Sequence, residues 1–328
     1  FDLPFALVEK YNGWEGRETV YAFERFAKIC FKEFGDRVKY WQPHNEQNLI
    51  VRVNERINIY DENDEYKIDK MRAQMDYNMC LAHALAVNAC HEMIPDSKIG
   101  PAVSSSVTYP LTCKPEDVYA ARMNDNFKVY YMLDMHQYGE YPGYYMNYLK
   151  ERNIMPVMKE GDKSILKKAK MDFIAVNYYR TNCAEALKAD DEHPLGSREG
   201  TVDFNMYGLF KMSMNPNLKA TEYGAAIDPS GLRVALNEYW QRYHLPLIIT
   251  ENGLGTPDIL TEDGKVHDEY RIDYLRSHIE ACALAIEDGV EMIGYCPWSF
   301  MDLLSSAQGF RKRYGLVYTN RTDDELLD

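Results

Sequence analysis

The feature that most constrains how this chain can fold is an alternation of apolar, strand-like runs with segments of helical periodicity. The apolar runs predict strands at residues 38–43, 98–104, 173–176, 245–250 and 291–298. Apolar residues at helical spacing predict helices at residues 17–34, 67–93, 115 to about 152, 229–243 and 268–287. Largely apolar strands that alternate with helices are typical of a parallel sheet covered on both faces. The pattern therefore fits both a doubly wound sheet and a (β/α)8 barrel.

Charge and composition exclude several classes of protein. The 328 residues include 37 Lys and Arg against 51 Asp and Glu, a formal net charge of −14, which disfavours binding to nucleic acid and to anionic membranes. No apolar run is long enough to predict a membrane-spanning helix. The seven cysteines are scattered and no leader peptide is visible, which predicts a cytoplasmic protein with reduced thiols.

Two carboxylates stand at the ends of predicted strands. Glu251 directly follows the run at 245–250, and Glu46 stands just after the run at 38–43. A charge at the end of a buried strand is costly unless it is paired or used, and two glutamates facing one substrate are what glycoside hydrolysis requires. From spacing alone, a glutamate just after a strand is most often a surface charge or a helix-capping neighbour, and His44 fits as a hydrogen-bonded wall residue.

Five motifs follow one another along the chain, at residues 11–14, 34–46, 172–179, 249–253 and 294–299. In this order they resemble the motifs of barrel strands three, four, six, seven and eight in glycoside hydrolase family 1, the retaining β-glycosidases. The resemblance implies a (β/α)8 TIM barrel, represented here by roughly strands 4–8 and their helices.

The resemblance begins in the loop after the third barrel strand and stops before the helix that follows the eighth. Residues 1–328 are therefore expected to form a single, incomplete TIM-barrel catalytic domain, and the sequence has no initiator Met. We expect either an N-terminal part left out of this sequence or a truncated product whose activity is doubtful.

The resemblance also implies the roles of individual residues. Glu251 corresponds to the nucleophile and Glu46 to the general acid/base, with carboxyl groups roughly 5–5.5 Å apart. The expected substrate-binding residues are Asn45, Asn177, Tyr178 and Trp298. Asn45 is expected to bond the sugar 2-hydroxyl, and Trp298 to form the floor under the ring. Tyr178 is expected to donate a hydrogen bond to Glu251.

The sequence around Glu46 departs from the family pattern. The family usually has Thr-Phe before Asn-Glu and Pro or Ile after it, whereas here Pro43 and His44 precede and Gln47 follows. We expect the catalytic roles to be kept and His44 to alter the proton environment of Glu46.

A basic segment near the C-terminus resembles a phosphate site. Ser305, Lys312 and Tyr314 resemble the residues that bind the 6-phosphate in the phospho-β-glycosidases of the family, and a hydroxyl, an ammonium and a phenol all donate to phosphate oxygens. Ordinary β-glucosidases of the family have a Glu at the position of Ser305, whose charge would repel phosphate. The small residue Ser306 resembles the residue of 6-phospho-β-glucosidases at this position, because the phospho-β-galactosidases of the family tend to have Trp at the same position.

The sequence thus predicts a 6-phospho-β-glucosidase that acts on phosphorylated β-glucosides after phosphotransferase uptake. No metal, nucleotide or flavin is expected, because two carboxylates perform the chemistry. Three alternatives stay open: an unphosphorylated β-glucosidase, a 6-phospho-β-galactosidase, and a sugar-binding fragment made inactive by truncation.

Overall fold

The computed structural model describes residues 3–50, 65–188, 210–305 and 308–323. The chain divides into two compact units. The first comprises Phe1–Ser104 and Phe127–Ala175, and the second comprises Ser105–Asn126 and Val176–Asp328. The single-domain organisation expected from the sequence stays a prediction.

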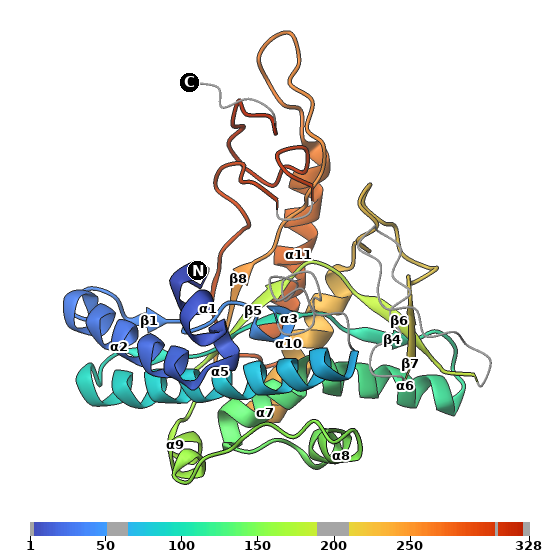
Figure 1. The fold of residues 1–328 in the computed structure, drawn as a ribbon. Helices are drawn as coiled ribbons and strands as arrows, with labels where there is room; N and C mark the ends of the chain where they lie inside the picture. Colours follow the sequence, from blue (N-terminus) through green and yellow to red (C-terminus); the bar gives the residue numbers. More distant parts are fainter. Residues whose placement is uncertain (1–2, 51–64, 189–209, 306–307, 324–328) are drawn as a thin grey trace. The chain divides into compact units, whose positions relative to one another are not determined.

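The first unit is mainly helical. Its helices are α1 (Phe5–Tyr11), η1 (Gly13–Glu15), α2 (Arg17–Phe34), α3 (Gln47–Ile50), α5 (Glu65–Met93), α7 (Tyr131–Tyr138), α8 (Gly143–Glu151) and α9 (Asp162–Lys168). The long helices α2 and α5 pack side by side (Figure 1). Helix α2 buries Val20, Phe23, Ala27 and Phe31, spaced three or four residues apart, which is the apolar stripe of an amphipathic helix. Helix α5 is buried nearly all round over residues 75–84, as expected of a central core helix.

The strands of the first unit are short. Strand β1 (Tyr40–Trp41) pairs in parallel with β2 (Lys98–Ile99), and β3 (Ala102–Ser105) follows. The predicted strand at 98–104 is interrupted because Pro101 lacks an N–H. Gly100 still pairs, since its N–H donates to the Trp41 carbonyl at 3.1 Å, and a Cβ there would lie 2.1 Å from the Phe173 carbonyl oxygen.

The second unit holds two groups of strands. Strands β4 (Thr108–Pro110) and β6 (Asn182–Ala186) are parallel, and β7 (Phe210–Ser213) is antiparallel to β6. Helix α6 (Pro115–Asp125) packs on these strands around a small core of Ala120, Ala121, Ala184, Phe210 and Met212 (Figure 1).

The other strands of the second unit carry the candidate nucleophile. Strand β5 (Ile174–Tyr178) crosses the boundary into this unit, where β5, β8 (Leu247–Glu251) and β9 (Met292–Tyr295) are neighbours in that order. Strands β8 and β9 are parallel. Helices α10 (Pro229–Tyr243) and α11 (Glu269–Glu287) pack together. These strands alternate with helices, as the sequence predicts.

Helix ends agree with the sequence better than strand ends do. The predicted helices at 17–34 and 229–243 are confirmed at both ends. Helix α10 begins where Pro229 fits the first turn and the Asp228 side chain accepts a hydrogen bond from the Gly231 N–H at 2.9 Å. The helix predicted to start at Pro115 is confirmed, and the helical patches predicted to about residue 152 are separated by the π-helical turn η3 (Asn126–Tyr130) and at Gly139, where φ is +74°.

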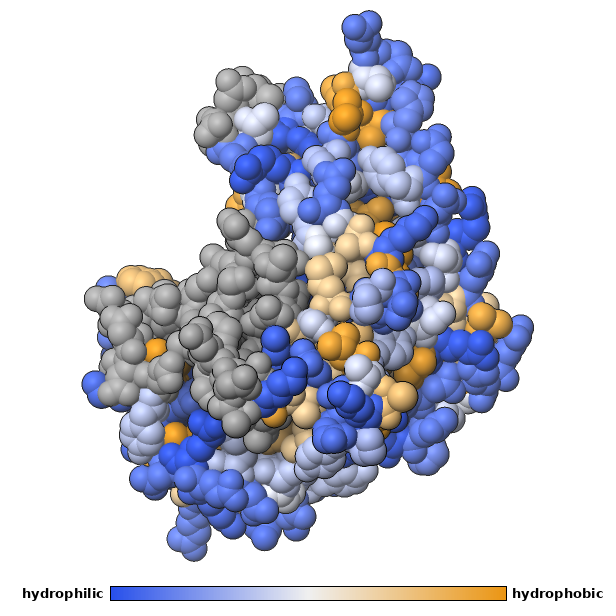
Figure 2. Space-filling model, turned by 90° about the vertical axis from the view of Figure 1, so that its right-hand side faces the viewer, coloured by the Kyte–Doolittle hydropathy of each residue, from blue (hydrophilic) through white to orange (hydrophobic). Residues whose placement is uncertain are grey.

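Hydrophilic side chains cover much of the face drawn in Figure 2, and hydrophobic side chains occur there in small separate groups. No helix within the described residues is long and apolar enough to cross a membrane.

Candidate active site

Glu251 is the last residue of β8, and its carboxylate is held by a tyrosine. The hydroxyl of Tyr179, which directly follows β5, donates a hydrogen bond to Glu251 Oε2 at 2.7 Å. The Oγ1 of Thr250 donates to Asn177 Oδ1 at 2.7 Å. The end of β5 and the end of β8 therefore present a carboxylate, a phenol and an amide beside one another.

The expectation for Tyr178 is wrong by one residue. The Tyr178 hydroxyl donates to the backbone carbonyl of Asp228 at 2.6 Å, and the ring is fully buried. Successive strand residues point to opposite faces, so the two tyrosine side chains diverge: Tyr179 reaches Glu251 while Tyr178 enters the core. In a Tyr-Tyr pair the sequence alone does not reveal which ring faces the carboxylate.

The loop after β8 fits closely against the segment that contains Trp298. Asn252 is fully buried, and its carbonyl accepts a hydrogen bond from the Trp298 N–H at 2.9 Å. A Cβ at Gly253 would lie 1.8 Å from the Trp298 carbonyl oxygen, so a side chain there would displace Trp298. The half-buried Trp298 precedes a cis peptide bond to Ser299. Glu251 and the expected floor of the sugar site are thus linked through the backbone.

Glu46 lies in the first unit, in a backbone conformation unusual for its residue type. Its φ is +50°, and its N–H donates to the Ala102 carbonyl at 3.0 Å. Asn45 forms a parallel bridge with the same residue. The separation of Glu46 and Glu251 expected of a retaining enzyme stays a prediction, as do the sugar contacts of Asn45 and Asn177.

His44 is buried among aromatic rings. Its ring stacks on Phe23 with centroids 4.5 Å apart and meets Trp14 edge-on at 5.1 Å. Burial lowers the pKa of His44 to about 3, although a hydrogen bond with the Met79 backbone opposes the shift. His44 is therefore neutral near pH 7 and brings no positive charge next to Glu46.

Two of the three residues expected to bind phosphate lie together. The Nζ of Lys312 is 4.9 Å from the ring centroid of Tyr223 and 5.5 Å from that of Tyr314. The Tyr314 ring is in turn 6.1 Å from the ring of Tyr179, the donor to Glu251. A Cβ at Gly255 would lie 2.5 Å from both Lys312 Cε and Tyr314 Cζ, so the loop after β8 passes directly against these two side chains.

The structure adds Arg180, which the sequence analysis missed. Burial lowers the pKa of Arg180, and Tyr314 acts in the opposite direction. Burial likewise lowers the pKa of Lys312, and the charge of Arg180 lowers it further. Within the described part of the chain, neither cation has a carboxylate at ion-pair distance. A single Arg after a strand has no distinctive spacing, so its nearness to Lys312 becomes visible only in the fold.

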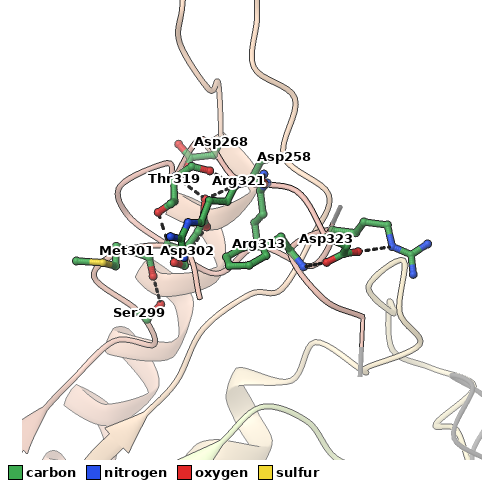
Figure 3. Close-up of polar contacts among 12 residues, drawn as sticks. Asp258, Asp268, Ser299, Met301, Asp302, Arg313, Thr319, Arg321 and Asp323 are labelled. Carbon is green, nitrogen blue, oxygen red and sulfur yellow. Dashed lines mark hydrogen bonds and ion pairs between the residues drawn. The ribbon is translucent and has the colours of Figure 1, made fainter. Parts of the chain in front are cut away.

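The other basic residues of the segment are paired. Arg313 forms a buried ion pair with Asp302, with 2.7 Å between Nη1 and Oδ2 (Figure 3). Arg313 also donates to the carbonyls of Thr319 and Arg321 at 2.7 and 2.8 Å. Such a charge-assisted network fixes the backbone of the segment. Arg313 therefore anchors the segment that carries Lys312 and Tyr314.

Arg311 and Ser305 have other surroundings. The Nε of Arg311 lies 3.5 Å from Asp323. Ser305 exchanges two backbone hydrogen bonds with Gly309, each of 3.0 Å, and its Oγ accepts from the Gln308 N–H at 3.5 Å. A phosphate contact by Ser305 stays a prediction. The substrate distinction drawn from Ser306 lies outside the described residues.

Comparison with known proteins shows the family. The sequence profile "Glycosyl hydrolase family 1" matches residues 1–327. The chain belongs to glycosyl hydrolase family 1. The curated relatives include "Aryl-phospho-beta-D-glucosidase BglC" from Bacillus subtilis (strain 168), 40% identical over 100% of this chain and 69% of the relative. The "Phospho-cellobiase" of Klebsiella oxytoca is 37% identical over 99% of this chain and 67% of its own.

A solved structure of the same family confirms the predicted fold class. The "Family 1 b-glucosidase from Thermotoga maritima" matches with a TM-score of 0.83 at 31% identity, over 97% of this chain and 67% of that one. The fold is therefore that of the family's (β/α)8 barrel, and family membership makes the protein a retaining glycosidase. Among the described residues, no group of three or more His, Cys, Asp or Glu is arranged to hold a metal ion.

Proposed function

We propose that this family 1 protein hydrolyses 6-phospho-β-glucosides with retention of configuration. The observation that carries the proposal is the pair of cations Arg180 and Lys312, which have no carboxylate partner among the described residues and lie near Tyr314. Two partly buried cations in an acidic protein are costly unless an anion joins them. The names of the relatives support the same substrate, since they include an aryl-phospho-β-glucosidase and a phospho-cellobiase.

The proposed reaction is a double displacement. Glu251 attacks the anomeric carbon while protonated Glu46 donates its proton to the leaving oxygen. Glu46 then removes a proton from water, which hydrolyses the glycosyl-enzyme and restores both carboxyl groups. Tyr179 holds Glu251 through its hydrogen bond, and Trp298 supports the sugar ring. Asn45 bonds the 2-hydroxyl, a contact that strengthens in the transition state.

In the same proposal, Lys312 and Tyr314 bind the 6-phosphate, with Ser305 as a third donor. Arg180 supplies a second positive charge. The substrate is produced by phosphotransferase uptake, and the enzyme acts in the cytoplasm as one barrel domain that includes both units. No cofactor takes part.

The test is a comparison of p-nitrophenyl β-glucoside 6-phosphate with p-nitrophenyl β-glucoside. We expect kcat/KM to be at least about 100-fold higher for the phosphorylated substrate, which corresponds to one or two charge-assisted hydrogen bonds. Equal or higher activity on the unphosphorylated glucoside overturns the proposal. Binding of sugar phosphates without turnover of any substrate supports the sugar-binding fragment instead.

A second candidate substrate is the galacto epimer. One relative, from Clostridium acetobutylicum, is a "6-phospho-beta-galactosidase" and is 36% identical over 98% of this chain. The galactoside 6-phosphate therefore belongs in the same assay, and preference for it replaces the gluco assignment without changing the mechanism.

A further inference from the structure

The segment that carries Glu46 is fixed on both sides. Glu46 itself has a left-handed backbone, which costs an ordinary L-residue energy and persists only where the surroundings enforce it. One constraint is the hydrogen bond from the Glu46 N–H to Ala102. The residues after Glu46 provide the others, and they do so through their side chains.

Gln47 is tied to a buried carboxylate. Its side-chain Nε2 lies 2.9 Å from Asp76 Oδ1, 3.2 Å from the Asp76 carbonyl and 3.1 Å from Cys80 Sγ. The exposed fraction is 1% for both Gln47 and Asp76. Because the two Asp76 oxygens can only accept, the orientation of the amide is fixed: its NH2 group faces helix α5.

Asp76 receives two further donors. The hydroxyl of Tyr141 donates to its Oδ2 at 2.6 Å, and the hydroxyl of Tyr131 donates to its Oδ1 at 3.1 Å. A carboxylate in the core needs such donors, and together they leave it little freedom to move. Asp76 is therefore a rigid anchor for the side chain of Gln47.

Asn48 fixes the other end of the segment. Its Nδ2 donates to the carbonyls of Ser104 and Lys128, both at 2.9 Å, and its Oδ1 accepts from the Ser104 N–H at 3.0 Å. The backbone of Glu46 is thus held between a strand contact and two buried amide side chains.

We propose that Gln47 and Asp76 are positioning residues for the proton transfer by Glu46. The proposal rests on the proposed function, in which Glu46 is the general acid. Proton donation requires hydrogen-bond geometry between donor and leaving oxygen, and a small displacement reduces the rate strongly. The network reaches Glu46 through its covalent neighbour, so it acts on the placement of Glu46 without touching the substrate.

The test uses aryl β-glucoside 6-phosphates with different leaving groups. A 2,4-dinitrophenolate leaves without protonation, whereas phenolate departure needs the acid. In Gln47→Leu, we expect kcat/KM for the phenyl substrate to fall about 30-fold, less than the roughly 10²- to 10⁴-fold lost when the acid itself is removed, while kcat/KM for the dinitrophenyl substrate falls less than about 3-fold. Asp76→Asn keeps the shape of the side chain and should show the same asymmetry at a smaller size, which preserves the test if Gln47→Leu does not fold.

Asp162 offers a matched control in the same unit. It is also a buried carboxylate, and it accepts from the Tyr77 hydroxyl at 3.0 Å and from the Lys159 N–H at 2.9 Å. Asp162→Asn should change both substrates by the same factor. The proposal is overturned if Gln47→Leu and Asp76→Asn also change both substrates equally or change neither. A failure of the proposed function is separate, because it appears in the unaltered protein as a lack of preference for the 6-phosphate.

Discussion

The two candidate catalytic glutamates are held in different ways. The described contacts fix Glu46 through its backbone, by a strand hydrogen bond and by the anchored side chains of its neighbours. At Glu251 the described contact is at the carboxylate, which accepts a hydrogen bond from the hydroxyl of Tyr179. A phenol donor suits an oxygen that must carry negative charge during attack, and a fixed backbone sets where a proton donor stands. Both contacts are compatible with the roles proposed for the two residues.

Removing each carboxylate in turn is the strongest test of the roles proposed for Glu46 and Glu251. Glu251→Gln should lower kcat on every substrate, on the order of 10⁵-fold, because no nucleophile remains. Glu46→Gln should lower kcat/KM about 10²- to 10⁴-fold on poor leaving groups and far less on dinitrophenyl substrates. Steady-state kinetics with both aryl substrates measure this. Similar profiles for the two variants would mean that the roles are not divided as proposed.

Lys312 tests whether the surroundings of Glu251 also set specificity. Lys312→Met should lower kcat/KM for the phosphorylated substrate about 50-fold by removing a charge-assisted hydrogen bond, and should leave the unphosphorylated substrate nearly unchanged. Arg180→Met should act in the same direction but less strongly. Arg311→Met is the control, because Arg311 lies beside Asp323 in the same segment. A loss of similar size in Arg311→Met would point to general electrostatic attraction.

Tyr178 and Tyr179 provide a test of which tyrosine holds Glu251. Tyr179→Phe removes the donor to Glu251 and should lower kcat about 10-fold with little effect on stability. Tyr178→Phe removes the bond to the Asp228 carbonyl and should cost about 1 kcal/mol of unfolding free energy with kcat nearly unchanged. Chemical denaturation and steady-state kinetics separate the two effects. If the effects were exchanged, the original expectation for Tyr178 would be restored.

A final prediction concerns pH and the buried imidazoles of the first unit. Burial lowers the pKa of both His44 and His136 to about 3. In the unfolded chain these groups titrate near their ordinary value of about 6.5, so between pH 3 and 6.5 the unfolded state binds more protons. Stability is therefore complete above about pH 6.5 and decreases as the pH falls, by at most about 1.4 kcal/mol per pH unit for each imidazole.

Unfolding measured at pH 4.5 and 7.5 checks this prediction. His136→Gln should reduce the loss of stability between the two pH values, because one titrating group is gone. His267→Gln should not, because His267 is exposed. An identical loss in all three proteins would show that other groups carry the pH dependence.

The sequence predicted helices better than strands, for physical reasons. Helix α10 is marked by Asp228 and Pro229, which act locally at its first turn. The predicted strand at 38–43 shortens to Tyr40–Trp41, because strand length depends on a partner elsewhere in the chain, here Lys98–Ile99. The residues that start a helix can be recognised within one segment of sequence, whereas the partner of a strand cannot.

The same distinction between local patterns and long-range contacts explains which site residues the sequence indicated. Glu46, Glu251, Lys312 and Tyr314 stand in motifs, so the sequence indicated them. The exchange of Tyr178 for Tyr179 depends on the face of the sheet to which each side chain at the end of β5 points, and the effect of Arg180 on Lys312 depends on the folded chain. The network of Gln47 and Asp76 joins residues that are 29 positions apart, which no local pattern reveals.

Gly253 and Gly255 place the expected floor of the sugar site and two candidate phosphate-binding residues against one loop. The first lies against Trp298 and the second against Lys312 and Tyr314, and neither position has room for even one methyl group. Any side chain acquired at either position would shift the sugar floor or the anion-binding residues relative to the carboxylate that begins the loop. We therefore expect a change of substrate to come from the residues that face this loop, and not from side chains at positions 253 and 255.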